Sequence, residues 1–151
     1  MTRPGKPALL DVNVLVALFD AEHVHHEVAH DWFADAHHDG WATCPLTENG
    51  VVRILSNRRY SPLAEPPGQT AARLRAFCQS PGHVFWPDDV SLRTTELFMD
   101  AVIYPHHATT DVYLLALAKH HGGRLATFDR SIPLSAVTGA TRDDLLVLAE
   151  V

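Results

Sequence analysis

The sequence predicts a three-layer α/β/α domain built on a central, mainly parallel β-sheet. Short apolar runs typical of buried strands alternate along the chain with longer segments whose apolar residues recur at helical spacing. A helix between two strands carries the chain back across the sheet, and this order favours parallel pairing. The 151 residues suffice for one such core and not for two ordinary domains. We therefore expect residues 1–151 to form a single domain.

The first predicted strand is followed directly by two helices. Residues 7–11, PALLD, form a short apolar run typical of a buried strand. Residues 12–20 and 22–38 both carry apolar side chains at helical spacing, and Gly40 is suited to end the second helix. Residues 41–45 are then expected to form the next short strand, which a proline ends.

The middle of the chain is expected to contain two more helices. Thr47 is a candidate cap for a helix over residues 46–57. Residues 61–68 hold three prolines and a glycine and are therefore expected to form a loop. A helix over residues 69–79 and a strand over residues 83–86 follow.

The last third of the chain is expected to add two helices and two strands. The first helix begins at Ser91 and ends near Asp100. The second covers residues 111–121, with a pair of threonines as candidate caps before it and two glycines after it. Residues 124–129 and 145–149 are the expected strands. In such a sheet a functional site lies beyond the carboxyl ends of the strands.

The overall composition excludes several classes of protein. With 18 acidic and 12 basic residues the net charge is −6, whereas avid, non-specific nucleic-acid binders are basic. No apolar run approaches the ~18 residues of a membrane span, and the first residues lack the apolar region of a secretory signal. The 2 cysteines form no spaced motif, which argues against a disulfide framework or a cysteine-based zinc site. We expect a cytoplasmic protein with no membrane association.

Four carboxylates occupy positions where acidic residues are unusual. Asp11 and Asp129 end predicted strands. Glu48 and Asp111 lie in the first turns of predicted helices, with apolar residues three, four and seven positions later, so their side chains point toward the core. Strand ends and helix starts of this kind share one edge of a parallel sheet. The four side chains can therefore converge there.

Convergence of four carboxylates requires compensating positive charge. Two unit charges ~4 Å apart repel by about 4 kcal/mol at an effective dielectric constant of about 20, and a helix N-terminus offsets only about 0.3–1 kcal/mol. Oxygen donors select hard ions, Mg²⁺ or Mn²⁺, and a wide cluster can hold two. The alternative is a buried salt-bridge network. Its candidate cations are Arg53, Arg58, Arg124 and Arg130.

Two small polar residues accompany the strand-end carboxylates. Asn13 lies two positions after Asp11, and Thr127 lies two positions before Asp129 on the same face of the strand. Their amide and hydroxyl groups can orient carboxylates or bound water. For Asn13 a simple helix-capping role remains equally open.

The 11 histidines offer a different metal site. His23, His26 and His30 share one face of a predicted helix and could bind Zn²⁺ or Ni²⁺ together with histidine pairs elsewhere. Most of these residues flank helix ends, where exposed histidine is ordinary, so this is the weaker interpretation.

Four short motifs follow one another along the chain: Asp11-x-Asn13 after a strand, Thr47-Glu48 opening a helix, Thr110-Asp111 before a helix rich in alanine and leucine, and Thr127-Phe128-Asp129 at a strand end. Together, over about residues 7–148, they resemble the PIN domain and, within it, the VapC toxins of bacterial type II toxin–antitoxin systems.

The resemblance implies a PIN-like fold and a Mg²⁺- or Mn²⁺-dependent endoribonuclease whose products carry a 5′-phosphate and a 3′-hydroxyl. It also implies a homodimer, and inhibition by a cognate VapB-like antitoxin whose tail occupies the acidic groove. Carried over by position, the catalytic and metal-binding residues are Asp11, Glu48, Asp111 and Asp129, and the supporting polar residues are Asn13 and Thr127.

These observations lead to the hypothesis of metal-assisted hydrolysis of RNA phosphodiester bonds, in which activated water is the nucleophile. Arginines could contact substrate phosphates; the candidates are Arg58, Arg59, Arg124 and Arg130. Two alternatives remain. One is a PIN-like module that binds RNA or antitoxin with little or no catalysis. The other is a magnesium-dependent phosphatase, which is disfavoured because Asn13 stands where the second acid of a D-x-D nucleophile motif belongs.

Overall fold

Five strands form one parallel sheet in the structure, a computed structural model that describes residues 5–148. The strands are β1 (Ala8–Leu10), β2 (Trp41–Thr43), β3 (His83–Phe85), β4 (Arg124–Thr127) and β5 (Leu145–Val147). They lie in the order β3-β2-β1-β4-β5, and every neighbouring pair is parallel. The predicted parallel sheet is thus confirmed. The last strand was expected to reach residue 149, which lies outside the described residues.

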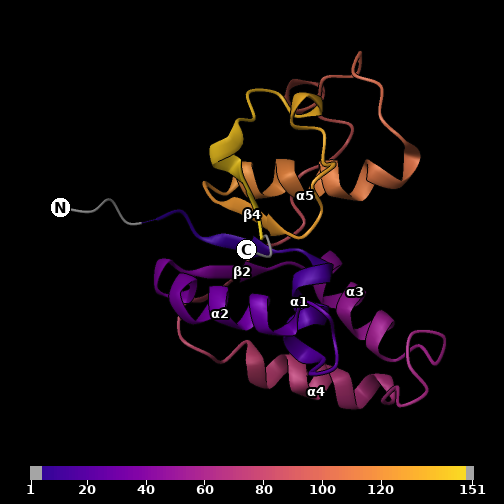
Figure 1. The fold of residues 1–151 in the computed structure, drawn as a ribbon. Coiled ribbons are helices and arrows are strands. Elements are labelled where there is room, and N and C mark those ends of the chain that lie inside the picture. The colour runs from indigo at the N-terminus through magenta and orange to yellow at the C-terminus, as the bar shows by residue number, and fades with distance from the viewer. Residues whose placement is uncertain (1–4, 149–151) are drawn as a thin grey trace.

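Helices cover both faces of the sheet. On one face lie α1 (Val12–Phe19), α2 (His26–Ala36), α3 (Pro45–Leu55) and α4 (Pro67–Phe77), and on the other lies α5 (Thr109–His120). Figure 1 shows this division, with α5 above the sheet and the other four helices below it. Neighbouring residues of β1 belong to the hydrophobic cores on opposite faces of the sheet. Leu9 packs in the core beside α5, called the α5 core here, and Leu10 packs in the core beside α1. The predicted three-layer architecture is confirmed.

The helix predicted over residues 91–100 is wrong. This segment contains only a 3₁₀ turn, Thr95–Leu97, and Phe98 instead forms an antiparallel bridge with Val137. The amide of Met99 donates to the carbonyl of Ala136. Pairing with a distant segment therefore supplies the hydrogen bonds that a helix would have made, and it buries Phe98 in the α5 core.

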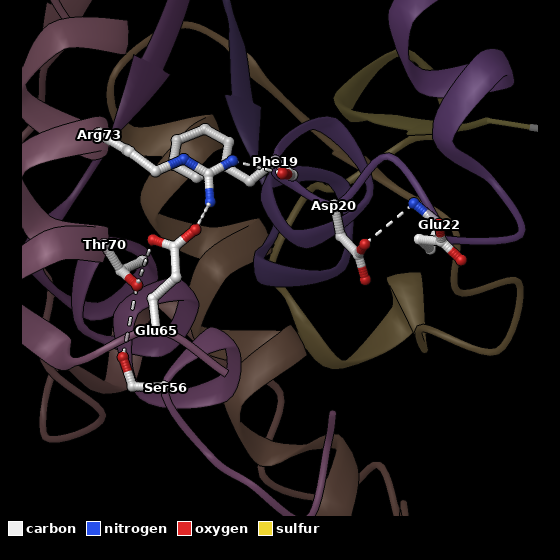
Figure 2. A network of polar contacts seen from close by, with 7 residues as sticks. All are labelled: Phe19, Asp20, Glu22, Ser56, Glu65, Thr70 and Arg73. Atoms are coloured by element: carbon white, nitrogen blue, oxygen red, sulfur yellow. Dashed lines mark hydrogen bonds and ion pairs between the residues drawn. The ribbon is translucent and has the colours of Figure 1, made fainter. Parts of the chain in front are cut away.

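Helix starts differ from the predictions by a few residues. The helix expected from residue 22 begins at His26, because the Asp20 carboxylate accepts a hydrogen bond from the Glu22 amide and holds the chain in a turn (Figure 2). Beside this turn, Arg73 of α4 donates to Glu65 and to the carbonyl of Phe19, which ties α4 to the end of α1 (Figure 2).

Helix α3 begins at Pro45, with Cys44 rather than Thr47 as its N-cap. Proline suits the first helical position because its fixed φ matches the helix and its missing N–H is not needed there. Thr47 acts from inside the helix, where its hydroxyl accepts a hydrogen bond from the Cys44 amide. Likewise Ala108, and neither threonine, is the N-cap of α5.

The strand order changes direction at β1. From this central strand the chain proceeds to β2 and β3 on one side, and later to β4 and β5 on the other. A crevice at the carboxyl ends of β1 and β4 follows from this topology, and such a switch point is where open α/β sheets bind ligands. Within residues 5–148, no helix has the length and apolar character that a membrane crossing requires.

Candidate active site

Asp11 lies at the switch point as the N-cap of α1. One carboxylate oxygen accepts a 2.7 Å hydrogen bond from the Val12 amide, and the other accepts a 2.7 Å hydrogen bond from the Thr127 hydroxyl. Its own amide donates to the carbonyl of Ala126, which fixes the residue against β4. Only 5% of Asp11 is exposed, and this burial raises the pKa of its carboxyl despite the two hydrogen bonds.

Thr127 connects the residues around Asp11. Its hydroxyl donates to Asp11 and accepts hydrogen bonds from the Asn13 side-chain amide at 3.2 Å and from the Asp129 amide at 3.0 Å. The Asn13 carbonyl oxygen in turn accepts from the Phe128 amide. The hydroxyl thus uses its single proton and both acceptor positions. Asn13 bonds across to β4 and its following loop, and Asp11 occupies the capping position.

Asp111 and Asp129 complete a cluster with Asp11. Burial, followed by the charges of Asp11 and Asp129, raises the pKa of Asp111 to about 7. The N-terminus of α5 favours an ionised carboxylate by only about 0.3–1 kcal/mol, so burial and the two neighbouring charges outweigh it. Hydrogen bonds from the hydroxyl and amide of Ser131 lower the pKa of Asp129. The cluster therefore combines two carboxyl groups whose pKa values are raised with one whose pKa is lowered.

Glu48 faces a different set of partners. It lies in the first turn of α3, and its carboxylate accepts a 2.7 Å hydrogen bond from the Thr43 hydroxyl at the end of β2. The Thr43 hydroxyl also lies 2.8 Å from Nε2 of His83. The structure thus brings three of the four predicted carboxylates into mutual electrostatic contact and gives Glu48 a separate polar environment.

In the part of the chain that the structure describes, lysine and arginine side chains do not neutralise the aspartate cluster. Among residues 5–148, no lysine or arginine forms an ion pair with Asp11, Asp111 or Asp129. Arg124 begins β4, so its backbone lies up to about 16 Å from that of Asp129, at the other end of the strand. Arg58 follows the far end of α3 from Glu48, about 15 Å along the helix. The described residues therefore do not form the salt-bridge network that composition left open.

Two histidines of α2 contact backbone carbonyls of α1. His26 Nδ1 lies 2.7 Å from the carbonyl of Ala17, and His30 Nε2 lies 3.1 Å from that of Leu18. These contacts occupy ring nitrogens at the end of α1, where carbonyls lack helical partners. Among the described residues, His23, His26 and His30 form no group of candidate metal ligands.

Sequence reasoning missed three residues near these carboxylates. Ser131 follows Asp129 by two positions, which is the spacing of an Asx turn and could have indicated its role. Thr43 is the last residue of β2, and Asp11 directly follows β1. This position at the carboxyl end of a strand was the signal that could have identified Thr43. His107 contributes a smaller electrostatic effect that lowers the pKa of Asp129, and no signal in the local sequence links these two residues.

The donor set of the aspartate cluster fits a hard divalent cation. The carboxylates come from three separate segments, two of them have raised pKa values, and no arginine or lysine of the described chain compensates them. Among the described residues the three carboxylates do not form a group whose ligand atoms all lie within 4.8 Å of one another, so an ion bound by all three requires these side chains to move closer together. Oxygen donors of this kind suit Mg²⁺ or Mn²⁺.

Fold and site together define a parallel α/β/α domain with an acidic site at the switch point of its sheet. A family model of the PIN domain matches residues 8–137, and the chain belongs to the PIN-domain family. Ribonuclease VapC39 of Mycobacterium tuberculosis is 46% identical over 132 residues, which cover 87% of this chain and 95% of that protein. Ribonuclease VapC44 of the same organism is 43% identical over 142 residues, with coverages of 93% and 99%. The predicted resemblance to VapC proteins is confirmed.

A solved structure supports the fold independently. VapC20 of Mycobacterium tuberculosis, described as a toxin that cleaves the sarcin–ricin loop, superposes with a TM-score of 0.57. It covers 83% of this chain and 92% of its own, at 18% identity. At that identity the likeness shows the shared fold.

Proposed function

We propose that this protein is a metal-dependent endoribonuclease and the toxin of a toxin–antitoxin pair. The observation that carries the proposal is the cluster of Asp11, Asp111 and Asp129 at the switch point, which no described lysine or arginine neutralises. Relatives named as VapC ribonucleases, 43–46% identical over most of this chain, support RNA as the substrate.

Mg²⁺ or Mn²⁺ is the proposed cofactor. Asp11, Asp111 and Asp129 would hold it, and Glu48 would act as a fourth carboxylate from the start of α3. A bound ion of this kind supplies positive charge that activates water and offsets charge on the reacting phosphodiester.

The chain's own residues prepare the site for this chemistry. Thr127 fixes Asp11 through its hydroxyl, and Asn13 fixes Thr127 in turn. Ser131 holds Asp129 with two hydrogen bonds of 2.6 and 2.8 Å, so this carboxylate remains ionised. Asp111, with a pKa of about 7, exchanges its proton near neutral pH. It can therefore be neutral in the free protein and ionised beside a cation.

Partner binding follows from the same charge distribution. An acidic groove attracts a cationic peptide, so a VapB-like antitoxin with a basic tail could occlude the site. Co-purification at low salt, with loss of binding after the basic tail is deleted, would support this part of the proposal. Unchanged affinity after the deletion would contradict it. The proposed homodimer is tested by light scattering of the purified protein.

RNA cleavage tests the proposed activity. Purified protein is expected to cleave structured RNA with Mg²⁺ and to lose this activity in EDTA. Asp11→Asn and Asp111→Asn are each expected to abolish cleavage without lowering the melting temperature. Cleavage that persists undiminished in both variants would exclude catalysis at this site.

A further inference from the structure

A second group of candidate metal ligands lies between α3, α4 and β3. One carboxylate oxygen of Glu48, Sγ of Cys78 and a ring nitrogen of His83 all lie within 4.8 Å of one another. Glu48 comes from the first turn of α3, Cys78 is the C-cap of α4, and His83 begins β3. The three residues are partly buried, in contrast to the mostly exposed group of Asp89, His120 and His121, which lies near the end of α5.

The Thr43 hydroxyl brings these three side chains together. It is fully buried, donates to Glu48 at 2.7 Å, and lies 2.8 Å from Nε2 of His83 and 4.0 Å from Sγ of Cys78. Its one proton goes to Glu48, so Nε2 of His83 must carry the hydrogen of their contact. The His83 ring also packs against the Trp41 ring at 4.6 Å between centroids. The imidazole is thus held in place from two sides.

The donor chemistry of this group differs from that of the aspartate cluster. Thiolate, imidazole and carboxylate together are a typical ligand set for Zn²⁺, whereas Mg²⁺ prefers oxygen alone. Zn²⁺ bonds of about 2.0–2.3 Å require the three donor atoms to move closer together than in this structure, where they lie within 4.8 Å of one another. Partial exposure leaves room for a water molecule in a fourth position.

We propose that Glu48, Cys78 and His83 form a Zn²⁺-binding site beside the nuclease centre. On binding, the Cys78 thiol releases its proton to the buffer, and the ring proton of His83 is held on the nitrogen that does not bind the ion. If the proposed nuclease function holds, Zn²⁺ also withdraws Glu48 from catalysis and so inhibits RNA cleavage.

Cobalt absorption tests the site directly. Co²⁺ replaces Zn²⁺ in such sites and gives a thiolate-to-metal absorption band, which reports cysteine ligation specifically. With excess Mg²⁺ present, the protein is expected to develop this band with Co²⁺ and to lose it when Zn²⁺ is added. Cys78→Ser is expected to eliminate the band. Cys44→Ser is the matched control, because serine is a good N-cap and Cys44 lies outside the ligand group.

A second variant keeps the test decisive if Cys78→Ser does not fold. His83→Gln leaves both thiols in place and is expected to weaken Co²⁺ binding at least ~10-fold. Asp89→Asn removes the exposed ligand group and is expected to leave the band unchanged. A missing band in the unmodified protein, or a band that survives in Cys78→Ser, would overturn the zinc site.

The regulatory consequence has a separate readout. Zn²⁺ is expected to slow Mg²⁺-dependent RNA cleavage in the unmodified protein and to have a smaller effect in Cys78→Ser. Equal inhibition of both proteins would overturn the role of this site in regulation. If the protein cleaves no RNA, the proposed function fails, whereas the cobalt band still decides whether the metal site exists.

Discussion

The Thr127 hydroxyl donates a 2.7 Å hydrogen bond to the Asp11 carboxylate, although the two residues are 116 positions apart in the sequence. The bond crosses the switch point between β1 and β4, where the sheet brings the ends of both strands together. It joins a carboxylate that is 5% exposed to a hydroxyl that is fully buried. The geometry of the aspartate cluster therefore depends on a contact that the sheet register creates.

Removal of the Thr127 hydroxyl should affect both stability and cleavage. Thr127→Val keeps the shape of the side chain but leaves the Asn13 amide and the Asp129 N–H without their acceptor. We expect a loss of about 1–3 kcal/mol in the free energy of unfolding and strongly reduced cleavage. Thermal unfolding and an RNA cleavage assay measure the two effects. Thr127→Ser retains the hydroxyl and should restore most of both; a valine variant equal to the unmodified protein would show that the bond is dispensable.

Asp111→Asn should stabilise the metal-free protein while it abolishes cleavage. The substitution removes a buried charge that two other aspartates repel. At about pH 8 in EDTA we expect a gain of at least ~1 kcal/mol, or roughly 2–4 °C in melting temperature. Asp35→Asn changes an exposed acid on α2 and serves as the control, with little effect on either property. A lower melting temperature for Asp111→Asn would contradict the proposed repulsion.

The stabilising effect of Asp111→Asn should depend on pH in a defined window. The carboxyl has a pKa of about 7 in the folded chain and an ordinary value of 3.8, so between these limits the folded state binds more protons than the unfolded state. Ionisation of Asp111 therefore lowers stability as pH rises from about 4 to 7. The lowered pKa values of His23 and His83 act in the opposite direction below about pH 6.5, so the difference between variant and unmodified protein is the useful quantity.

Denaturant unfolding in EDTA at several pH values measures this difference. It should be near zero at about pH 4 and should grow up to about pH 7. A difference independent of pH would show that Asp111 has an ordinary pKa in the folded protein.

Glu48→Gln tests whether the α3 carboxylate belongs to the catalytic site. Glutamine retains an oxygen that can accept the hydrogen bond from Thr43, so stability should change little. If Glu48 acts with the three aspartates, cleavage should fall about 10- to 100-fold. Initial cleavage rates at saturating Mg²⁺ measure the effect. Unchanged rates would restrict the site to Asp11, Asp111 and Asp129.

Much of the fold was predictable because it depends on local pattern. The apolar runs that lead up to Asp11 and Asp129 identify two strands and their carboxyl ends. Parallel pairing then places those ends on one edge of the sheet. The helix predicted over residues 91–100 failed for a different reason. The bridge between Phe98 and Val137 joins segments that only the completed fold brings together, so no local signal could favour it over a helix.

The same limit applies to Glu48. Its position in the first turn of α3 correctly placed the side chain on a partly buried face. The choice of partner depends on the register between β2 and β3, which sets Trp41 opposite His83 and so brings the His83 ring within reach of Thr43. That register is not visible in either strand alone, because each is only 3 residues long.

A crystal structure of the protein grown with Mn²⁺ tests the central claim most directly, because anomalous scattering locates the ion. The account predicts an anomalous peak bound by carboxylate oxygens of Asp11, Asp111 and Asp129, and no such peak in crystals of Asp111→Asn. A peak elsewhere on the molecule, or these three carboxylates paired with arginine or lysine side chains and no ion between them, would contradict it.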